Sequence, residues 1–380
     1  MEKRRLGKTG MEASVIGLGC EHLDNKPYEI VDETISAAIE SGINIFDVFM
    51  PGEEVRKNIG RALSGKRDGV LVQGHIGSVD LRRQYDISRE PSICKRYFYN
   101  LLRDLKTDWI DFGMLFFIDS QKAFDEVING EILRFAQRLK ENGTIRAIGA
   151  SSHNPLIARQ VAETGAIDLL LFSINPAFDM TPLNQSVLDS LDADFKDQKY
   201  FGIRPDRLEL YRLCESLDIA ITVMKTLGGG KLLSAGQTPF VKPMTAAQCI
   251  HYALTRPAVA SALIGCQSRE QVLEAVKYLD ASDDERDCTS IVNSFQSFAG
   301  NCVYCGHCQP CPSNIDIAAV NKYLDIARLS EAAPPSVISH YKFLDARGGD
   351  CLACGSCEER CPFNVSIIKN MGEAVKVFGE

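Results

Sequence analysis

Eight cysteines in two runs near the end of the chain have the spacing that most clearly predicts chemistry. Three thiolates separated by two residues each can bind one face of an iron–sulfur cube, and a fourth Cys followed by Pro typically ligates the second cluster of a two-cluster protein. The spacing therefore predicts two [4Fe–4S] clusters and a role in electron transfer. The predicted ligand sets are Cys302, Cys305 and Cys308 with Cys361, and Cys351, Cys354 and Cys357 with Cys311.

The two runs differ in one respect, which leaves alternatives open. The second run has the bacterial two-cluster spacing, whereas the first has one residue fewer before Cys311. The missing residue either shifts the point where the chain crosses between clusters or removes a ligand. Zinc is the alternative occupant, since paired C-x2-C motifs also build zinc sites, but zinc needs neither the third cysteine nor the trailing proline. Disulfides are disfavoured because nothing marks the chain as secreted.

The composition is that of a soluble globular protein. The chain has 380 residues, of which 45% are hydrophobic and 24% charged. A net charge of −8 argues against a general nucleic-acid binder. We find no apolar run long enough to span a membrane and no signal-peptide core at the start. We therefore expect a cytoplasmic protein with no nucleic-acid or membrane partner.

Short apolar strands alternate with amphipathic helices from residue 14 to about residue 279. Near-continuous apolar runs are typical of strands buried on both faces. Eight strand–helix units predict a (β/α)8 barrel, with a doubly wound sheet as the alternative. The expected strands are Ser14–Leu18, Asn44–Asp47, Gly69–Gln73, Ile110–Phe117, Ile145–Ala150, Leu169–Asn175, Ala220–Met224 and Ala262–Gly265. The expected helices are Glu29–Glu40, Glu54–Leu63, Ile93–Leu105, Phe124–Asn142, Pro155–Thr164, Pro205–Leu217, Ala246–Leu254 and Ser268–Leu279.

The pattern divides the chain into three parts. We expect the barrel at 1–280, a linker with a short helix at 281–300, and a small, mostly helical two-cluster domain at 301–380. A long polar stretch at 180–204 is expected to cover the C-terminal mouth of the barrel.

Several segments match a known family in order along residues 3–280. They are RRLGKTG, SVIGLG, GINIFD, IGRAL, DWIDFGML, IRAIGASS, LGGGKLL and ALIGCQSREQV. On these segments the barrel resembles the aldo-keto reductase family. The cysteine runs make the chain similar to the subgroup that carries a C-terminal two-cluster ferredoxin-like domain.

The resemblance implies a catalytic Asp, Tyr, Lys and His set, of which only the Asp is retained. Asp47 matches the aspartate, and no tyrosine occupies positions 48–52, where the family phenol would lie. His75 or Gly74 occupies the lysine position, and Phe116 the histidine position. We therefore predict Asp47 and His75 as the catalytic residues, with His75 as the proton donor, and weak ordinary NADPH-dependent carbonyl reduction.

A glycine-rich turn is the candidate cofactor site. Glycines let backbone amides approach a phosphate, and flanking lysines add positive charge. The alternative is a flexible loop with solvated lysines. The resemblance also places Ile174 where an aromatic normally covers the nicotinamide. We expect FMN, with NADP as the alternative, held by Ser151, Ser152, Lys225, Gly228, Gly229, Gly230 and Lys231.

Other titratable residues also follow the strands, at the end where barrels of this type do their chemistry. They are Glu21, His22, Asp119 and His153. A weaker reading makes Cys20, His22 and His75 a metal site.

Three functional hypotheses follow from these residues. The first is an iron–sulfur oxidoreductase in which the cluster domain packs at the barrel mouth and exchanges electrons with a small-molecule site there. It would receive electrons from a redox partner protein. The second is an NADPH-dependent carbonyl reductase with altered acid chemistry, and the third is a non-catalytic electron carrier or docking protein.

Overall fold

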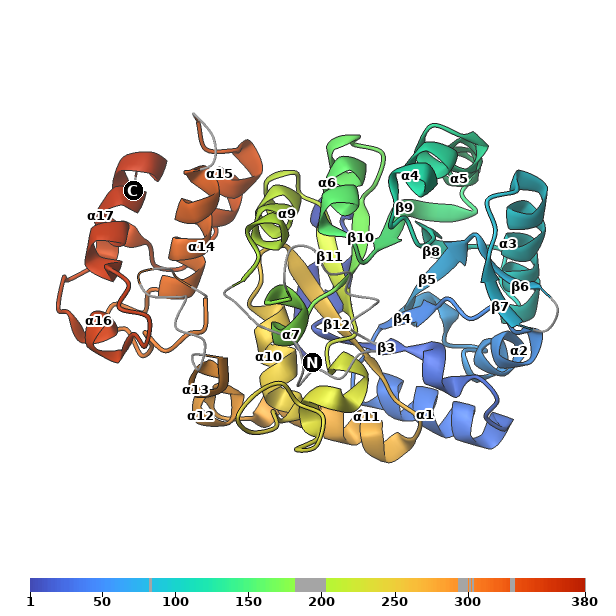
Figure 1. Ribbon diagram of the computed structural model, residues 1–380, viewed down its shortest axis with the longest axis horizontal. Coiled ribbons are helices and arrows are strands. Elements are labelled where there is room, and N and C mark those ends of the chain that lie inside the picture. Colours follow the sequence, from blue (N-terminus) through green and yellow to red (C-terminus); the bar gives the residue numbers. More distant parts are fainter. Residues whose placement is uncertain are drawn as a thin grey trace.

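The computed structural model describes residues 1–81, 84–181, 203–292, 300, 302, 304–328 and 332–379. A barrel forms one part of the molecule, and helices from the C-terminal part of the chain lie beside it (Figure 1). The stretch expected to cover the mouth, 180–204, lies almost wholly outside the described residues.

Eight parallel strands close into a barrel in which the strand order follows the chain. Each strand overlaps one of the predicted apolar runs, so the predicted (β/α)8 barrel is confirmed. Pairing of the last strand with the first closes the ring, which excludes the doubly wound sheet. The strands are β3 (Ile16–Gly19), β4 (Ile45–Val48), β5 (Leu71–Ile76), β8 (Ile110–Leu115), β9 (Ile145–Ser152), β10 (Leu169–Ser173), β11 (Ala220–Met224) and β12 (Val259–Gly265).

Amphipathic helices surround the strands and bury one face each. They are α1 (Tyr28–Glu40), α2 (Glu53–Ala62), α3 (Pro91–Leu105), α4 (Gln121–Ile128), α5 (Glu131–Glu141), α6 (Pro155–Glu163), α9 (Pro205–Ser216), α10 (Ala246–Leu254) and α11 (Arg269–Val276), with a short α7 (Pro176–Asp179) after β10. The single helix expected at 124–142 is two helices, α4 and α5. Gly130 separates them in an extended conformation, and a Cβ there would lie 2.1 Å from the Glu126 carbonyl oxygen.

Two hairpins were not predicted, because their strands are too short to show a clear alternation. β1 (Lys3–Arg5) and β2 (Glu12–Ser14) pair antiparallel. Leu6 and Met11, which lie between them, join the apolar core inside the barrel, so this hairpin closes the N-terminal end of the barrel. The second hairpin, β6 (Ser78–Leu81) and β7 (Gln84–Ile87), follows β5 at the opposite end, the mouth.

A buried carboxylate connects the mouth to the wall of the barrel. Asp179, in α7, accepts hydrogen bonds from Arg207 Nε (2.7 Å) and the Tyr211 hydroxyl (2.6 Å), both on α9. The Tyr252 hydroxyl of α10 donates to its other oxygen (2.8 Å). Burial alone would lower the pKa of Arg207, but Tyr211 and Asp179 outweigh burial and raise it. The guanidinium therefore stays charged, and the network fixes α7, α9 and α10 relative to one another.

The C-terminal part, residues 300–379, is a helical group that we call the cysteine module. Its helices are α14 (Ile317–Ala327), α15 (Pro335–Lys342), α16 (Ser356–Arg360) and α17 (Ile367–Phe378). Short helices α12 (Asp283–Arg286) and α13 (Thr289–Val292) precede it, in the region predicted as a linker. Among the described helices none is long and apolar enough to cross a membrane.

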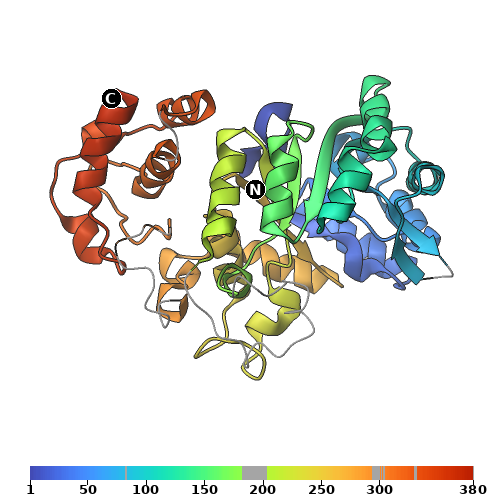
Figure 2. The same cartoon turned by 45° about the horizontal axis from the view of Figure 1, so that its top comes forward.

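The cysteine module packs against the outside of the barrel wall, at α9 and α10, and not over the mouth as predicted (Figures 1 and 2). Both α14 and α15 contact α9. The chain that leads to the module lies along α10, because α12 contacts α10 and Gln248 Nε2 donates to the Asp287 carbonyl (2.5 Å). The prediction had placed the module at the mouth from the linker length alone.

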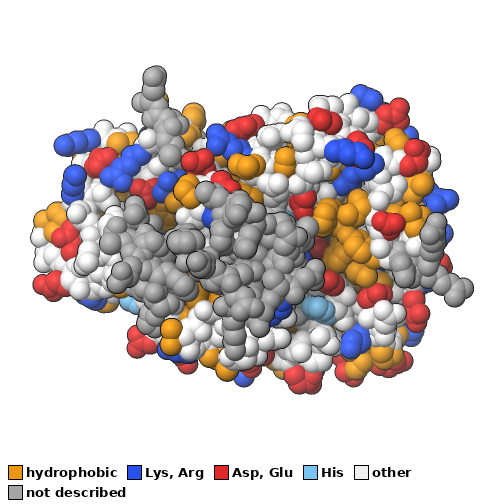
Figure 3. Space-filling model, in the orientation of Figure 1, with side chains coloured by type: hydrophobic (Ala, Val, Ile, Leu, Met, Phe, Trp, Pro, Cys, Tyr) orange, Lys and Arg blue, Asp and Glu red, His pale blue; other side chains and the backbone are white. Residues whose placement is uncertain are grey.

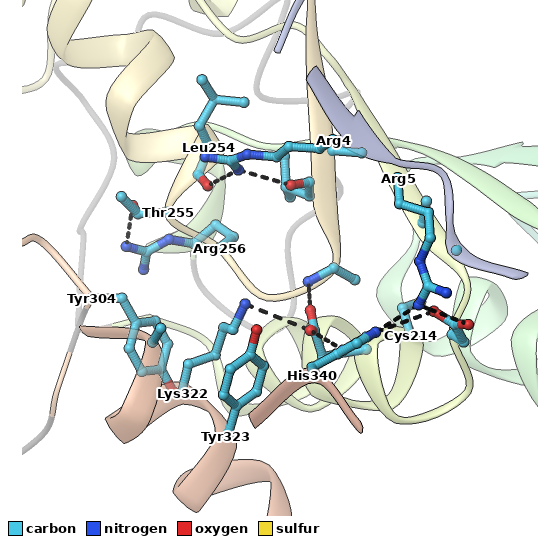
Figure 4. A pocket seen from close by; sticks show the side chains of 18 of the residues that line it. Arg4, Arg5, Cys214, Leu254, Thr255, Arg256, Tyr304, Lys322, Tyr323 and His340 are labelled. Carbon is cyan, nitrogen blue, oxygen red and sulfur yellow. Dashed lines mark hydrogen bonds and ion pairs between the residues drawn. The ribbon is translucent and has the colours of Figure 1, made fainter. Parts of the chain in front are cut away.

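Charged residues line a cavity of about 420 Å³ between the wall and the module (Figure 4). At its edge the buried Glu215 of α9 accepts a hydrogen bond from His340 Nδ1 of α15 (3.2 Å), and Lys322 Nζ of α14 lies 3.5 Å from it. Burial alone would raise the pKa of Glu215, but Lys322, His340 and the Ala258 backbone N–H outweigh burial and lower it to about 2. This carboxylate therefore holds both module helices on the barrel.

We predict that Glu215→Gln weakens the docking of the module by about 3 kcal/mol, because the variant leaves the Lys322 charge without its partner. Hydrogen exchange of α14 and α15 measures the effect. In the wild type, this stabilisation is present above the ordinary carboxyl pKa of 4.5 and is lost as the pH falls towards 2. The control is Glu209→Gln, an exposed partner of Arg159. Equal protection of α14 in both variants would contradict the role of Glu215.

Candidate active site

Asp47 and His75 form a buried pair at the mouth end of β4 and β5. His75 Nε2 lies 2.8 Å from Asp47 Oδ1. Side chains alternate along a strand, so His75 faces the barrel interior like Gln73, which reaches across to Thr222. Gly74 faces outward, where a Cβ would meet Leu101. His75, and not Gly74, therefore occupies the position that the resemblance assigns to the lysine.

Aromatic rings surround this pair on the mouth side. The His75 ring lies 5.0 Å from that of Phe116 and 6.0 Å from that of Phe49, in edge-to-face contacts. The His75 side chain has 0% exposure, and its Nδ1 is buried without a hydrogen-bond partner among the described residues. Arg89 Nη1 donates a hydrogen bond to the Phe116 carbonyl (2.8 Å). The predicted catalytic pair is thus brought together but lies beneath an apolar layer.

Tyr85 brings a phenol to the mouth that was not identified from the sequence. It lies on β7, and its ring contacts Phe49 (5.8 Å) and Phe116 (6.0 Å). Tyr85 is 43% exposed. Figure 3 shows hydrophobic side chains gathered near β5 and β8. Partial burial of the side chain, and then the nearby Glu21 charge, raise the pKa of Tyr85. The strand that carries Tyr85 has only four residues, which is too short for a sequence pattern to predict the strand or to place Tyr85 at the mouth.

A second His–Asp pair lies beyond the end of β9. His153 Nδ1 is 2.8 Å from Asp119 Oδ2, and the His153 backbone N–H donates to Asp119 Oδ1 (2.6 Å). The Ser152 hydroxyl shares its proton between the same oxygen (2.9 Å) and the Ile118 carbonyl (2.7 Å). Burial alone would raise the pKa of Asp119, but His153 and Ser152 outweigh burial and lower it. Asp119 therefore stays a carboxylate that orients the imidazole.

The predicted cofactor residues Ser151 and Ser152 both make internal hydrogen bonds. Ser151 Oγ accepts from the Phe117 backbone N–H (2.8 Å), and Ser152 Oγ lies 2.7 Å from the Ile118 carbonyl. Their hydroxyls thus order the loop after β8, which carries Phe117 and Asp119.

The glycine-rich turn follows β11 and forms a short helical turn at Gly228–Leu233. Gly228, Gly229 and Gly230 have φ angles of 58°, 65° and 84°, a run of left-handed conformations that side chains disfavour. A Cβ on Gly229 or Gly230 would meet nothing within 4 Å, so the backbone there is open to a ligand. Thr226 is buried, and its Oγ1 has no hydrogen-bond partner among the described residues.

The two cysteine runs gather around two small cavities. One cavity is lined by Cys302, Cys305, Cys308 and Cys361, and the other by Cys311, Cys351, Cys354 and Cys357. Each therefore combines three cysteines of one run with the last of the other, and Cys311 reaches the second cavity despite the shorter first run. Burial raises the pKa of Cys308 to about 12, so this thiol is protonated unless a cation lowers its pKa.

The described residues contain no group of three His, Cys, Asp or Glu side chains that could hold a single metal ion. The reading of Cys20, His22 and His75 as a metal site is therefore wrong. Cys20 is buried, and burial raises the pKa of its thiol. It packs as a small apolar side chain.

Comparisons with known proteins agree with the barrel. The family model for the Aldo/keto reductase family matches residues 15–248, which end before the cysteine runs. The chain is similar to the uncharacterized oxidoreductase YqkF of Bacillus subtilis (strain 168), with 26% identity over 323 residues, 81% of this chain and 99% of YqkF.

Two solved structures share the fold at 20% identity. The holo form of aldo-keto reductase AKR11C1 from Bacillus halodurans has a TM-score of 0.58 over 75% of this chain and 94% of its own. PA4992 from Pseudomonas aeruginosa has a TM-score of 0.54 over 73% of this chain and 96% of its own. At this identity the likeness shows the fold alone.

We predict that Asp47→Ala lowers the free energy of unfolding by about 1–3 kcal/mol, because His75 then keeps no hydrogen bond while it stays buried. Urea denaturation measures the change. Asp108→Ala, at an exposed position before β8, is the control and should change stability by less than about 0.5 kcal/mol. A loss no larger than that of the control would show that the pair is not stabilising.

Proposed function

The chain belongs to the aldo/keto reductase family and is an oxidoreductase, and from this premise we propose that its barrel works with a two-cluster iron–sulfur module. The observation that carries the proposal is the pair of cavities lined by four cysteines each. Four thiols per cavity, drawn from both runs, are the ligand number and crossing pattern of two-cluster ferredoxin-like proteins. Bound clusters would supply one-electron transfer.

The ligand number and the spacing favour iron–sulfur clusters over zinc. Four cysteines line each cavity, three of them from one run and the fourth from the other. A two-cluster iron–sulfur protein uses this crossing of ligands, with a proline after the fourth cysteine. Zinc sites need neither the third closely spaced cysteine nor that proline.

The two cavities differ in their distance from the barrel. Residues of the first run contact the wall: His251 Nε2 of α10 lies 3.3 Å from the Cys305 carbonyl, and the Arg256 guanidinium lies 5.9 Å from the centre of the Tyr304 ring. At the second cavity Cys354 is exposed, and Leu352 is 70% exposed. The first cavity therefore lies beside the barrel and the second lies near the exposed surface. This arrangement suits a module that contacts the barrel at the first cavity and binds a redox partner protein at the second.

The barrel mouth offers a site for a phosphate-bearing redox cofactor. The Thr226 hydroxyl has no hydrogen-bond partner among the described residues, and the backbone of Gly229 and Gly230 is open. Both features fit an anionic group at the turn. We favour FMN over NADP, because Ile174 takes the place of the aromatic that normally covers a nicotinamide. A small organic substrate would bind beside this cofactor.

We predict about eight iron atoms per chain after anaerobic purification, four for each cavity. Cys311→Ser should disrupt the cluster of the second cavity and lower the iron content towards about four, because Cys311 lines that cavity with the second run. Cys94→Ser, a buried cysteine of α3, is the control and should keep the full iron content. Zinc in place of iron, or four iron or fewer in the wild type, would overturn the proposal.

We predict that the protein reduces simple aldehydes with NADPH about a hundred-fold or more slowly than ordinary members of the family. The reason is that the loss of one acid–base group lowers the rate about 10²–10⁴-fold. Steady-state assays measure the rate, and the visible spectrum of the purified protein reports any bound flavin. Ordinary rates that vanish in Asp47→Ala would support the NADPH carbonyl reductase instead. Full cluster content with no turnover for any donor would support the carrier hypothesis.

A further inference from the structure

The two His–Asp pairs at the mouth differ in which imidazole nitrogen is available. In the pair of Asp47 and His75, the bonded nitrogen is Nε2, and the remaining Nδ1 is buried. In the pair of Asp119 and His153, the bonded nitrogen is Nδ1. His153 Nε2 makes no hydrogen bond to any described residue. Unlike His75 Nδ1, it is not a fully buried atom, and 7% of the His153 side chain is exposed. Only the second pair leaves a nitrogen for a substrate.

Asp119 determines the tautomer of His153. Its carboxylate already accepts the His153 backbone N–H and the Ser152 hydroxyl, so it faces Nδ1 as an acceptor. The proton of a neutral imidazole therefore sits on Nδ1, and Nε2 carries the lone pair. A carboxylate that orients a histidine in this way is the arrangement that prepares an imidazole for proton transfer.

The charges around His153 make it a ready proton donor once it is protonated. Burial lowers its pKa, Asp119 raises it in part, and Lys225 and Arg207 lower it further, with a net shift below the ordinary value. These are the charged groups that face the ring from the loops after β8 and β11 and from α9. An imidazolium held in this environment gives up its proton readily.

The position of His153 fits a reaction site displaced from the family tyrosine. It directly follows β9, on the mouth side where barrel chemistry takes place. The rings of Phe116 and Phe117, 5.9 Å apart, separate it from His75, and the Phe117 ring lies 5.1 Å from that of His153. A substrate carbonyl against Phe117 would meet His153 and not Asp47.

We propose that His153, oriented by Asp119, donates the proton to the substrate oxygen in place of the missing tyrosine. The inference rests on the proposed reductive function. In the balanced step, the carbonyl carbon accepts a hydride from a reduced nicotinamide or flavin, the C=O π bond breaks, and the oxygen takes the Nε2 proton. His153 is left neutral and takes its next proton from water. In the reverse direction the Nε2 lone pair accepts the proton.

The test compares His153→Gln and Asp119→Asn with His22→Gln, an exposed histidine at the same mouth. Turnover is measured with a panel of aldehydes, ketones and quinones, and with NADPH or reduced FMN, whichever the purified protein uses. We expect kcat to fall about 10²–10⁴-fold in His153→Gln, with cofactor affinity and iron content unchanged. We expect His22→Gln to stay within about threefold of the wild type. Unchanged kcat in His153→Gln would overturn the inference while leaving the proposed function intact.

A readout without turnover separates catalysis from structure. Imidazole ¹⁵N NMR of the wild type should show Nδ1 protonated at neutral pH, and a His153 pKa below 6.5. The pKa should fall further in Asp119→Asn, which removes the charge that raises it. A neutral imidazole protonated on Nε2, or a pKa insensitive to Asp119→Asn, would overturn the assignment. A wild type without turnover on the whole panel would overturn the proposed function and this inference with it.

Discussion

The buried carboxylate of Asp179 is the interaction on which the connection between the barrel mouth and the cysteine module depends. Arg207 and Tyr211 from α9 and Tyr252 from α10 all donate to it. Such a buried charge is tolerated only when a counter-charge and several hydrogen bonds satisfy it, as they do here. Because the same two helices carry the module on their outer faces, the position of α7 at the mouth and that of the module on the wall are set together.

Two His–Asp pairs lie at the mouth, one at the ends of β4 and β5 and one after β9. Phe116 contacts His75 of the first pair, and Tyr85 from the β6–β7 hairpin contacts Phe116, so this pair lies beneath aromatic rings. The pair that leaves an imidazole nitrogen for a substrate lies instead after β9, where His153 contacts Asp119. Two neighbouring rings divide the site, since Phe116 contacts His75 of the first pair and Phe117 contacts His153 of the second.

The module is held by charge where it meets the barrel near α15, and by a mixture of ring and polar contacts near the first cavity. Lys322 of α14 and His340 of α15 both contact Glu215 of α9. His251 and Arg256 meet the first cysteine run along α10. These contacts place the first of the two cavities beside the barrel.

The sequence by itself determined the features that depend on local pattern. Apolar runs and helical periods located all eight strands, and Gly42 at the end of α1 has the left-handed φ of 87° expected of a residue that ends a helix. Cysteine spacing sorted the eight thiols into the two sets that line the cavities. The resemblance to the family also predicted which family positions Asp47, His75 and Phe116 occupy. Tertiary structure alone decided how distant segments meet. It placed Tyr85 over Phe116, buried His75 while leaving His153 Nε2 available, and directed the module to the wall. These outcomes depend on side-chain packing between residues far apart in the chain, for which neither periodicity nor spacing carries a signal.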